Sequence, residues 1–245
     1  MDLVPAIEPS GVVSVVGAGG KKSTMYALAA ALDRAVVTAT VRIPIFDSHV
    51  ERVVVTDDPA EAIAGAGGED WPLGLVPDQE REDRYRGYDP AVVDAIAATG
   101  VPEAVLVKAD GARMRLLKSP GENEPRIPAA TNTLLPVASA HVVGKPLTDE
   151  HVHRAERVTD VAGRSPGERI RAEDVGRVLA SEAGGRKDAP EGATVVPVVN
   201  MVDDADLVAV GREIAGAVLA HASSIPRVVL AKMVAQDPVV DVVER

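Results

Sequence analysis

The chain has 245 residues, 46% hydrophobic and only 2% aromatic, so it can bury a large and mostly aliphatic core. Its formal net charge of -11 disfavours nucleic acid and anionic lipid as partners, and the lack of cysteine excludes disulfides and cysteine-ligated zinc. The N-terminus lacks a signal-peptide pattern, and no apolar stretch approaches the ~20 residues that span a bilayer. We therefore expect a cytoplasmic protein without membrane partners. The acidic excess favours a halophilic protein over an ordinary acidic one.

Short apolar runs typical of buried strands alternate along the chain with helical patterns. The predicted strands are 12–17, 35–40, 51–57, 73–76, 104–110, 134–140, 194–200 and 227–233. The predicted helices are 23–34, 59–66, 89–100, 149–162, 172–185 and 203–222. This alternation predicts an α/β fold with a mostly parallel sheet and helices on both faces.

We expect one domain over residues 1–245, interrupted by two long polar loops. The first covers residues 78–88. The second, near 111–130, follows a strand end, where open α/β sheets place their ligands. We interpret residues 183–193 as a surface connection without a functional role.

The first predicted strand and helix are joined by the stretch VVGAGGKKST, residues 15–24. Glycines let backbone N–H groups surround a phosphate, a lysine reaches the outer phosphates and a hydroxyl holds magnesium. The candidate phosphate-binding residues are Gly17, Ala18, Gly19, Gly20, Lys21, Lys22, Ser23 and Thr24. The alternative without a binding function is a tight strand-to-helix turn with solvated lysines.

Neither standard motif fits this stretch completely. The dinucleotide pattern G-x-G-x-x-G fails because Lys22 occupies its last glycine position. In the mononucleotide pattern G-x-x-x-x-G-K-[ST], using Lys21 puts Val15 at the first glycine, and using Lys22 puts Lys21 at the second. The residues alone do not decide whether Lys21 or Lys22 would contact the phosphates.

Two strand ends carry further candidates. Asp110 ends the strand 104–110, where such folds hold magnesium or its water shell, and Ser23 is the candidate magnesium hydroxyl. Thr40 and Arg42 follow the strand 35–40 and are candidate phosphate contacts, although Arg42 also suits a plain surface position.

The strand 194–200 ends in NMVD, which has the spacing of motifs that read guanine. Asn200 and Asp203 are therefore candidate base-binding residues, with Met201 in place of the usual lysine. In such motifs the Asp accepts hydrogen bonds from the guanine edge, and the Asn ties the base loop to the phosphate loop. Asp203 fits an N-cap of the helix 203–222 equally well.

Taken in order, these stretches resemble the accessory proteins of selenium-dependent molybdenum hydroxylases, the YqeC-like family of P-loop proteins. The resemblance rests on residues 15–29, 38–43, 105–128, 143–156 and 198–204, of which 105–128 is the most specific. It implies a P-loop NTPase-like fold that binds ATP or GTP with Mg²⁺. It also implies a maturation factor that handles a molybdopterin-type or selenium-containing ligand, with a molybdenum hydroxylase or its maturation machinery as partner.

The family loop is similar to G-A-G-G-K-T-T, which places its lysine on Lys21 and its hydroxyls on Lys22 and Ser23. The family strand is similar to V-E-A-D-G-A, so Asp110 matches and Lys108 replaces an acid. Both departures add positive charge near the expected magnesium position, which predicts tight nucleotide binding with slow hydrolysis. The alternative is a non-hydrolysing nucleotide-binding or cofactor-carrier module that signals to a partner protein.

A basic stretch after Asp110 contains Arg113, Arg115 and Lys118. Arg113 and Lys118 are candidate contacts to a phosphate or an anionic cofactor. His151 and His153 would face different sides of a helix, which favours hydrogen bonding over metal ligation. No catalytic triad or carboxylate pair stands out.

Overall fold

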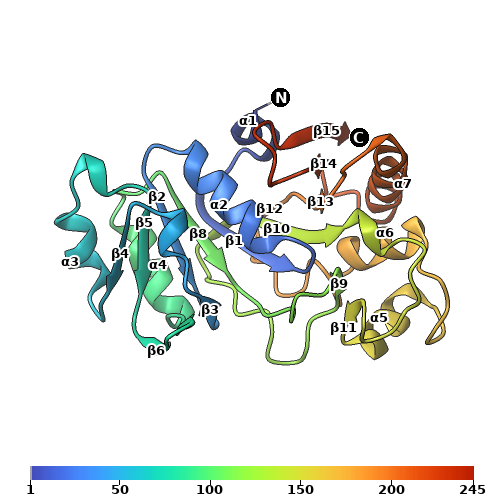
Figure 1. Cartoon of the computed structure of the whole chain (residues 1–245), viewed down its shortest axis with the longest axis horizontal. Coiled ribbons are helices and arrows are strands. Elements are labelled where there is room, and N and C mark those ends of the chain that lie inside the picture. Colours follow the sequence, from blue (N-terminus) through green and yellow to red (C-terminus); the bar gives the residue numbers. More distant parts are fainter. Residues whose placement is uncertain (1) are drawn as a thin grey trace.

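The computed structural model describes residues 2–245, and its central feature is a ten-stranded sheet (Figure 1). In chain order the strands are β1 (Gly11–Gly17), β2 (Ala35–Ala39), β4 (Arg52–Val55), β5 (Leu73–Val76), β8 (Ala104–Lys108), β10 (Thr131–Ser139), β12 (Thr194–Val195), β13 (Val198–Asn200), β14 (Arg227–Ala231) and β15 (Val239–Glu244). They lie in the order β15-β14-β13-β10-β1-β8-β2-β5-β4, with β12 paired to β10. Within this sheet only the β14–β15 pairing is antiparallel. The mostly parallel sheet is confirmed.

Helices cover both faces of this sheet, as predicted (Figure 1). They are α1 (Leu3–Ile7), α2 (Lys21–Ala31), α3 (Pro59–Ala64), α4 (Pro90–Ala98), α5 (Ala155–Ala162), α6 (Ala172–Ala180) and α7 (Ala205–His221), with the short 3-10 turns η1 (Asp47–His49), η2 (Gly68–Asp70) and η3 (Ala140–Val142). The helices α1 and α2 pack on one face. On the other face α3 and α4 cover the half toward β4, while α6 and α7, with α5 against α6, cover the half toward β15.

The strand β1 shows why the buried strands read as continuous apolar runs. Val13 and Val15 belong to the core beneath α1 and α2, whereas Val12 and Val16 belong to cores on the other face. Successive side chains of a strand point to opposite faces, so a strand covered on both sides needs apolar residues at nearly every position.

The elements missed by the predictions are short or lie at the ends of the chain. The predicted helix 149–162 begins only at Ala155, because β11 (Val152–His153) precedes it and pairs with β9 (Leu117–Lys118). The expected loop 78–88 contains β6 (Gln79–Arg81) and β7 (Arg84–Tyr85), which form a small sheet with β3 (Ile43–Pro44). The terminal elements α1 and β15 were not predicted, so 227–233 is not the last strand.

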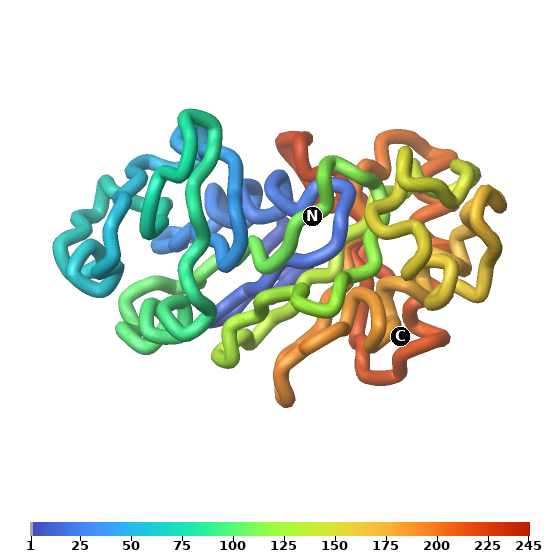
Figure 2. The backbone as a smooth tube through the Cα atoms, turned by 90° about the horizontal axis from the view of Figure 1, so that it is seen from below, coloured from blue at the N-terminus to red at the C-terminus, as the bar shows by residue number. Residues whose placement is uncertain are grey.

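The carboxyl ends of β1, β8, β10 and β13 meet at one edge of the sheet. Figure 2 shows the green segment after β8 running beside the blue turn after β1. A backbone hydrogen bond joins the two, from Gly19 N to Arg115 O at 2.9 Å, and another joins the same green segment to the end of β10, from Ser139 N to Leu116 O at 2.9 Å. Open α/β sheets bind ligands at this edge, which makes it the place to look for a functional site. Among residues 2–245, none of the helices combines the length and apolar character needed to cross a membrane.

Candidate functional site

The glycine turn between β1 and α2 consists of only Ala18, Gly19 and Gly20. Gly17, Gly19 and Gly20 have φ values of 90°, 75° and 124°, which side-chain-bearing residues rarely adopt. A Cβ atom at Gly19 would collide with Ser139, and one at Gly20 would collide with the side chain of Asn200. All three glycines are therefore required both by the backbone and by close neighbours.

The turn also explains why neither standard motif fits. In the mononucleotide pattern the lysine follows the first glycine by six positions, but Lys21 follows Gly17 by four. The turn is thus two residues shorter than that pattern. Lys21 opens α2, is 6% exposed, and directs its ammonium group back to Gly17 O and Asp110. Lys22 is half-buried and makes no side-chain hydrogen bond or ion pair within residues 2–245, so the structure brings Lys21 to the turn.

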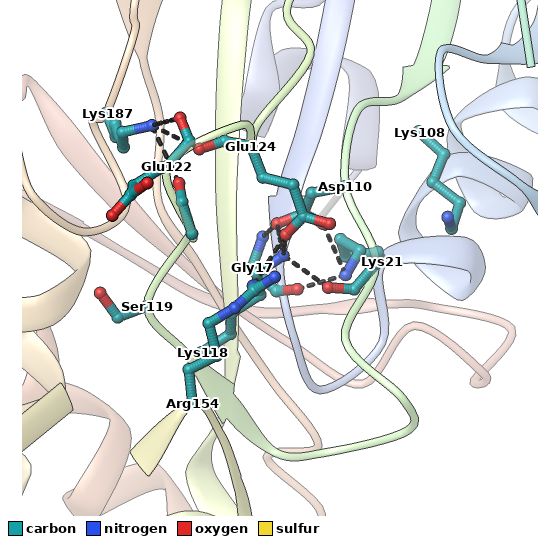
Figure 3. Close-up of polar contacts among 12 residues, drawn as sticks. Gly17, Lys21, Lys108, Asp110, Lys118, Ser119, Glu122, Glu124, Arg154 and Lys187 are labelled. Carbon is teal, nitrogen blue, oxygen red and sulfur yellow. Dashed lines mark hydrogen bonds and ion pairs between the residues drawn. The ribbon is translucent and has the colours of Figure 1, made fainter. Parts of the chain in front are cut away.

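Asp110 lies directly beside this turn and is 1% exposed (Figure 3). Its Oδ1 lies 2.8 Å from Lys21 Nζ, and its Oδ2 lies 2.9 Å from Lys118 Nζ and accepts a hydrogen bond from Gly17 N at 3.0 Å. Burial by itself raises the pKa of Asp110, but the two lysines and the Gly17 N–H hold that pKa below its usual value. Asp110 is therefore a carboxylate at neutral pH.

The contacts continue outward from Asp110 through alternating charges. Lys118 Nζ lies 2.6 Å from Glu124 Oε2, and the same oxygen lies 2.8 Å from a terminal nitrogen of Arg154. We call the series Lys21, Asp110, Lys118, Glu124 and Arg154 the ion-pair chain; Figure 3 shows these side chains in sequence. The Lys118 side chain is fully buried, and a buried charge is tolerated only when it is paired in this way.

Lys187 fastens the segment that carries Glu124. Its Nζ donates to the backbone oxygens of Gly121 at 3.0 Å, Glu122 at 3.1 Å and Glu124 at 2.6 Å (Figure 3). Ser119 Oγ also donates to Ala183 O at 3.1 Å. Residues 183–193 connect α6 to β12, and they also hold the loop over the glycine turn, a structural role that the sequence did not indicate.

The loop packs closely on the turn. The space between them, bordered by Gly17, Asp110, Lys118 and Pro120 among others, has a volume of about 10 Å³. Such a space holds no more than a single water. A ligand on this side of the turn would have to displace the loop.

Asn200 holds the glycine turn from the opposite side. It is 3% exposed, donates from Nδ2 to Gly19 O at 3.0 Å, and accepts at Oδ1 from Met233 N at 3.0 Å. Both ends of its amide are thus engaged with backbone. Asn200 therefore positions the turn, and each end of its amide makes one hydrogen bond to the backbone.

Asp203 remains at the surface near this turn. Its Oδ2 lies 2.7 Å from His141 Nε2, and its Oδ1 lies 3.6 Å from Lys232 Nζ. The N-cap of α7 is Asp204, whose side chain accepts a hydrogen bond from Leu207 N. The alternative interpretation of Asp203 as that cap is therefore wrong, and Asp203 stays a candidate base contact.

Thr40 and Arg42 point elsewhere. Thr40 Oγ1 donates to Arg126 O at 2.6 Å, and the exposed Arg42 side chain pairs with Glu80 at 2.6 Å. The backbone oxygen of Arg42 accepts a hydrogen bond from Lys108 Nζ at 2.7 Å. Neither predicted phosphate contact has its side chain bonded to the turn.

Lys108 is a buried lysine that forms no ion pair with a carboxylate within residues 2–245. In Figure 3 it stands apart from the contact between Lys21 and Asp110. Burial, reinforced by the charge of Lys21, lowers the pKa of Lys108 to about 7. The sequence predicted that Lys22 and Lys108 add positive charge near Asp110. Neither of them pairs with Asp110; besides Lys21, the lysine that pairs with it is Lys118.

The donor set at the turn suits phosphate better than a metal ion. Curled glycine backbone and a buried lysine match a phosphate group. Both Asp110 oxygens already face ammonium groups, and no hydrogen bond joins Ser23 to Asp110 in the described chain. Residues 2–245 contain no group of three or more His, Asp or Glu side chains placed to hold a metal ion.

Comparison with known proteins assigns the family. The model of the family described as YqeC protein matches residues 13–156. The chain belongs to the YqeC family. The uncharacterized protein YqeC of Escherichia coli (strain K12) is 30% identical over 193 residues, which cover 77% of this chain and 75% of that protein. The YqeC match includes the glycine turn and the whole ion-pair chain, whereas Asn200 and Asp203 lie beyond it.

Proposed function

We propose that this YqeC-family protein binds ATP or GTP at the glycine turn and acts as a maturation factor for a selenium- or molybdenum-cofactor-containing hydroxylase. One observation carries the nucleotide proposal: a buried lysine opens a helix directly after the glycine turn at the carboxyl end of a central strand. Membership of the YqeC family supports the accessory role. The proposed partners are the hydroxylase or its maturation machinery, and the proposed cargo is a molybdopterin-type or selenium-containing ligand.

The proposed phosphate contacts follow from the turn. Backbone N–H groups from Gly20 to Ser23 would surround the phosphates, because those of Ala18 and Gly19 already donate to Val137 O and Arg115 O. Lys21 would reach the outer phosphates. Lys21 now pairs with Asp110, so a phosphate oxygen would compete with that carboxylate for the same ammonium group. Asp203 is the proposed base contact, with Asn200 holding the turn in register.

Magnesium at Ser23 and Asp110 remains part of the proposal. When bound, the ion would supply positive charge to the phosphates. Asp110 would first have to exchange Lys21 or Lys118 for the ion, because both of its oxygens are already paired. This competition supports slow hydrolysis, since an aspartate neutralised by two lysines holds a cation weakly.

A pair of lysine variants tests the nucleotide proposal. We expect Lys21→Ala to abolish ATP and GTP binding in calorimetric titrations, while Lys22→Ala leaves the affinity within about threefold. Each titration is run with and without Mg²⁺, in low and high potassium chloride, because the net charge of -11 also supports a halophilic protein. Equal losses in the two variants, or unchanged affinity in Lys21→Ala, would contradict the proposed site.

The second candidate function is a non-hydrolysing nucleotide-binding or carrier module. The doubly paired state of Asp110 favours it, because no carboxylate at the turn is left free to hold a metal ion or to orient a water. Phosphate release by purified protein separates the two functions. Measurable turnover that depends on Lys21 supports the first, and intact binding without turnover supports the second.

A further inference from the structure

A second polar feature lies beside the glycine turn and is not used by the proposed nucleotide site. It is an open cavity of about 380 Å³ between the loop after β8 and the start of α5. Its lining residues are Arg113, Arg115, Asp149, Val152, His153, Arg154 and Glu156. The volume lies in the range of small-molecule sites. We call it the arginine cavity.

The cavity carries guanidinium groups with unused hydrogen-bonding capacity. Arg113 is exposed and makes no side-chain hydrogen bond or ion pair within residues 2–245. Arg115 donates from Nε to Asp149 O at 2.6 Å, which leaves its terminal nitrogens free of recorded contacts in the described chain. Arg154 contacts Glu124 through one terminal nitrogen. Three arginines face only two lining carboxylates, Asp149 and Glu156.

The local potential is positive although the protein is strongly acidic. Burial is the first cause that lowers the pKa of His153, and the nearby charges of Arg154, Lys118 and Arg113 lower it further, against the opposing charge of Glu124. The start of α5 adds the partial positive charge of a helix N-terminus, although Asp149 Oδ1 accepts from Ala155 N at 3.3 Å and Glu156 lies in the first turn. Both effects favour an anion in the cavity.

The backbone holds these arginines in unusual conformations. Arg113, Met114 and Arg154 have φ values of 46°, 60° and 61°, in the left-handed region that residues other than glycine rarely adopt. Such backbone strain is concentrated at functional sites. The adjacent Met114 side chain is 95% exposed, so packing of that side chain does not account for the strained turn.

We propose that the arginine cavity binds a small molecule bearing a phosphate group, as a second ligand beside the nucleotide. A phosphate group matches several guanidinium donors and a helix N-terminus better than a single carboxylate does, because it carries more charge and more acceptor oxygens. The inference deepens the proposed function by naming the chemical class of the second ligand, and it rests on that function only for the pairing of the two ligands.

The two sites share structural elements. Arg115 lines the cavity, while its backbone oxygen accepts the hydrogen bond from Gly19 in the glycine turn. Arg154 lines the cavity and also ends the ion-pair chain that begins at Lys21. A phosphate that draws Arg154 away from Glu124 therefore changes the surroundings of Lys118 and Asp110.

Inorganic phosphate is the probe, and ¹H–¹⁵N correlation spectra of the full-length chain are the readout. The Lys21→Ala background removes the principal phosphate ligand of the turn, so the test does not depend on nucleotide binding. We expect saturable shifts of the Val152, His153 and Glu156 amides in the millimolar range. Arg113→Gln in this background weakens the binding at least about fivefold, whereas Arg81→Gln does not. Arg81 is the matched control, an exposed arginine in β6 that makes no recorded side-chain contact within residues 2–245.

The outcomes separate the two proposals. Absence of saturable shifts near His153 would overturn the arginine cavity as a phosphate site, and so would equal weakening by Arg81→Gln. Equal shifts with acetate at the same ionic strength would overturn the choice of phosphate. Failure of the nucleotide proposal would appear instead as missing ATP and GTP binding in the unmodified protein. Well-dispersed spectra of each variant establish that it is folded.

Discussion

The glycine turn and the arginine cavity are neighbouring cationic regions with opposite organisation. At the turn, Lys21 and Lys118 are buried and share one carboxylate, Asp110. In the cavity, Arg113 is exposed and has no recorded partner within residues 2–245. A ligand at the turn has to displace internal partners and the loop above them, whereas a ligand in the cavity meets donors that are already free. Burial with pairing gives a fixed geometry, and exposure gives ready access.

The largest effect is expected when Asp110, the carboxylate shared by the two buried lysines of the turn, is removed. We expect Asp110→Asn to destabilise the protein by roughly 3–5 kcal/mol, because Lys21 and Lys118 would stay buried without their partner. Urea unfolding measures the free energy. The control is Asp160→Asn on α5, an exposed residue, which should change it by less than about 0.5 kcal/mol. A loss below about 1 kcal/mol in Asp110→Asn would mean that the buried pairing is energetically unimportant.

A second test uses Lys108, the buried lysine that pairs with no carboxylate in the described part of the chain. The pKa of Lys108 is about 7 in the folded protein and 10.5 in the reference state, so the unfolded chain binds more protons between these values. Stability should therefore rise with pH across this window, by up to about 1.4 kcal/mol per pH unit from this residue. The cost of burying the charged form is complete below pH 7 and disappears above 10.5.

Lys108→Met removes this titration. We expect the variant to be more stable than the unmodified protein at pH 7, by roughly 2 kcal/mol or more, with the advantage shrinking as pH rises toward 10. Lys22→Met, at a half-buried position, is the control and should show no such trend. A constant difference between Lys108→Met and the unmodified protein at every pH would contradict the lowered pKa.

The ion-pair chain that joins the two regions can be cut at Glu124. We expect Glu124→Gln to cost about 1–2 kcal/mol of stability, a value reduced by its partial exposure, because Lys118 and Arg154 lose their common partner. The effect of bound phosphate on nucleotide affinity should also fall. The control is Glu122→Gln, whose side chain is 86% exposed. Unchanged coupling in Glu124→Gln would show that the two sites communicate by another route.

The smallest effect on stability is expected at the fastening of the loop. Lys187→Met should change the unfolding free energy by no more than about 1 kcal/mol, yet hydrogen exchange across residues 119–125 should become faster. Nucleotide association should also become faster, because the loop covers the turn. Lys145→Met replaces an exposed lysine and serves as the control. Unaltered exchange would mean that the three carbonyl contacts of Lys187 do not hold the loop.

Most of the fold could be predicted because its strands and helices are long enough to show a hydrophobic pattern. The two-residue strands β9 and β11 are too short for any period. β11 lies in the first part of a predicted helix, and β9 lies in an expected loop. The expected N-cap of α7 was wrong by one residue. Asp203 and Asp204 are adjacent and both suit an N-cap by residue type, so the sequence could not choose between them.

The candidate site was predictable only as a set of strand ends. Asp110 and Asn200 follow buried strands, so topology alone places them near the glycine turn. Their partners come from loops without a periodic pattern. Arg154 lies in a family-like stretch that offered some signal, whereas Lys187 offered none, because a surface lysine becomes a loop fastener only through the path of the chain.

The position of Asn200 determines how far the chain could be shortened while keeping the glycine turn intact. The family match covers residues 13–156, but the amide that holds Gly19 comes from the end of β13 and is itself held by Met233. A truncated protein ending near residue 156 would contain every residue of the ion-pair chain yet lack the strands that brace the turn. We expect such a fragment to fold poorly, so the region that the family model matches and the smallest working unit are different pieces of the chain.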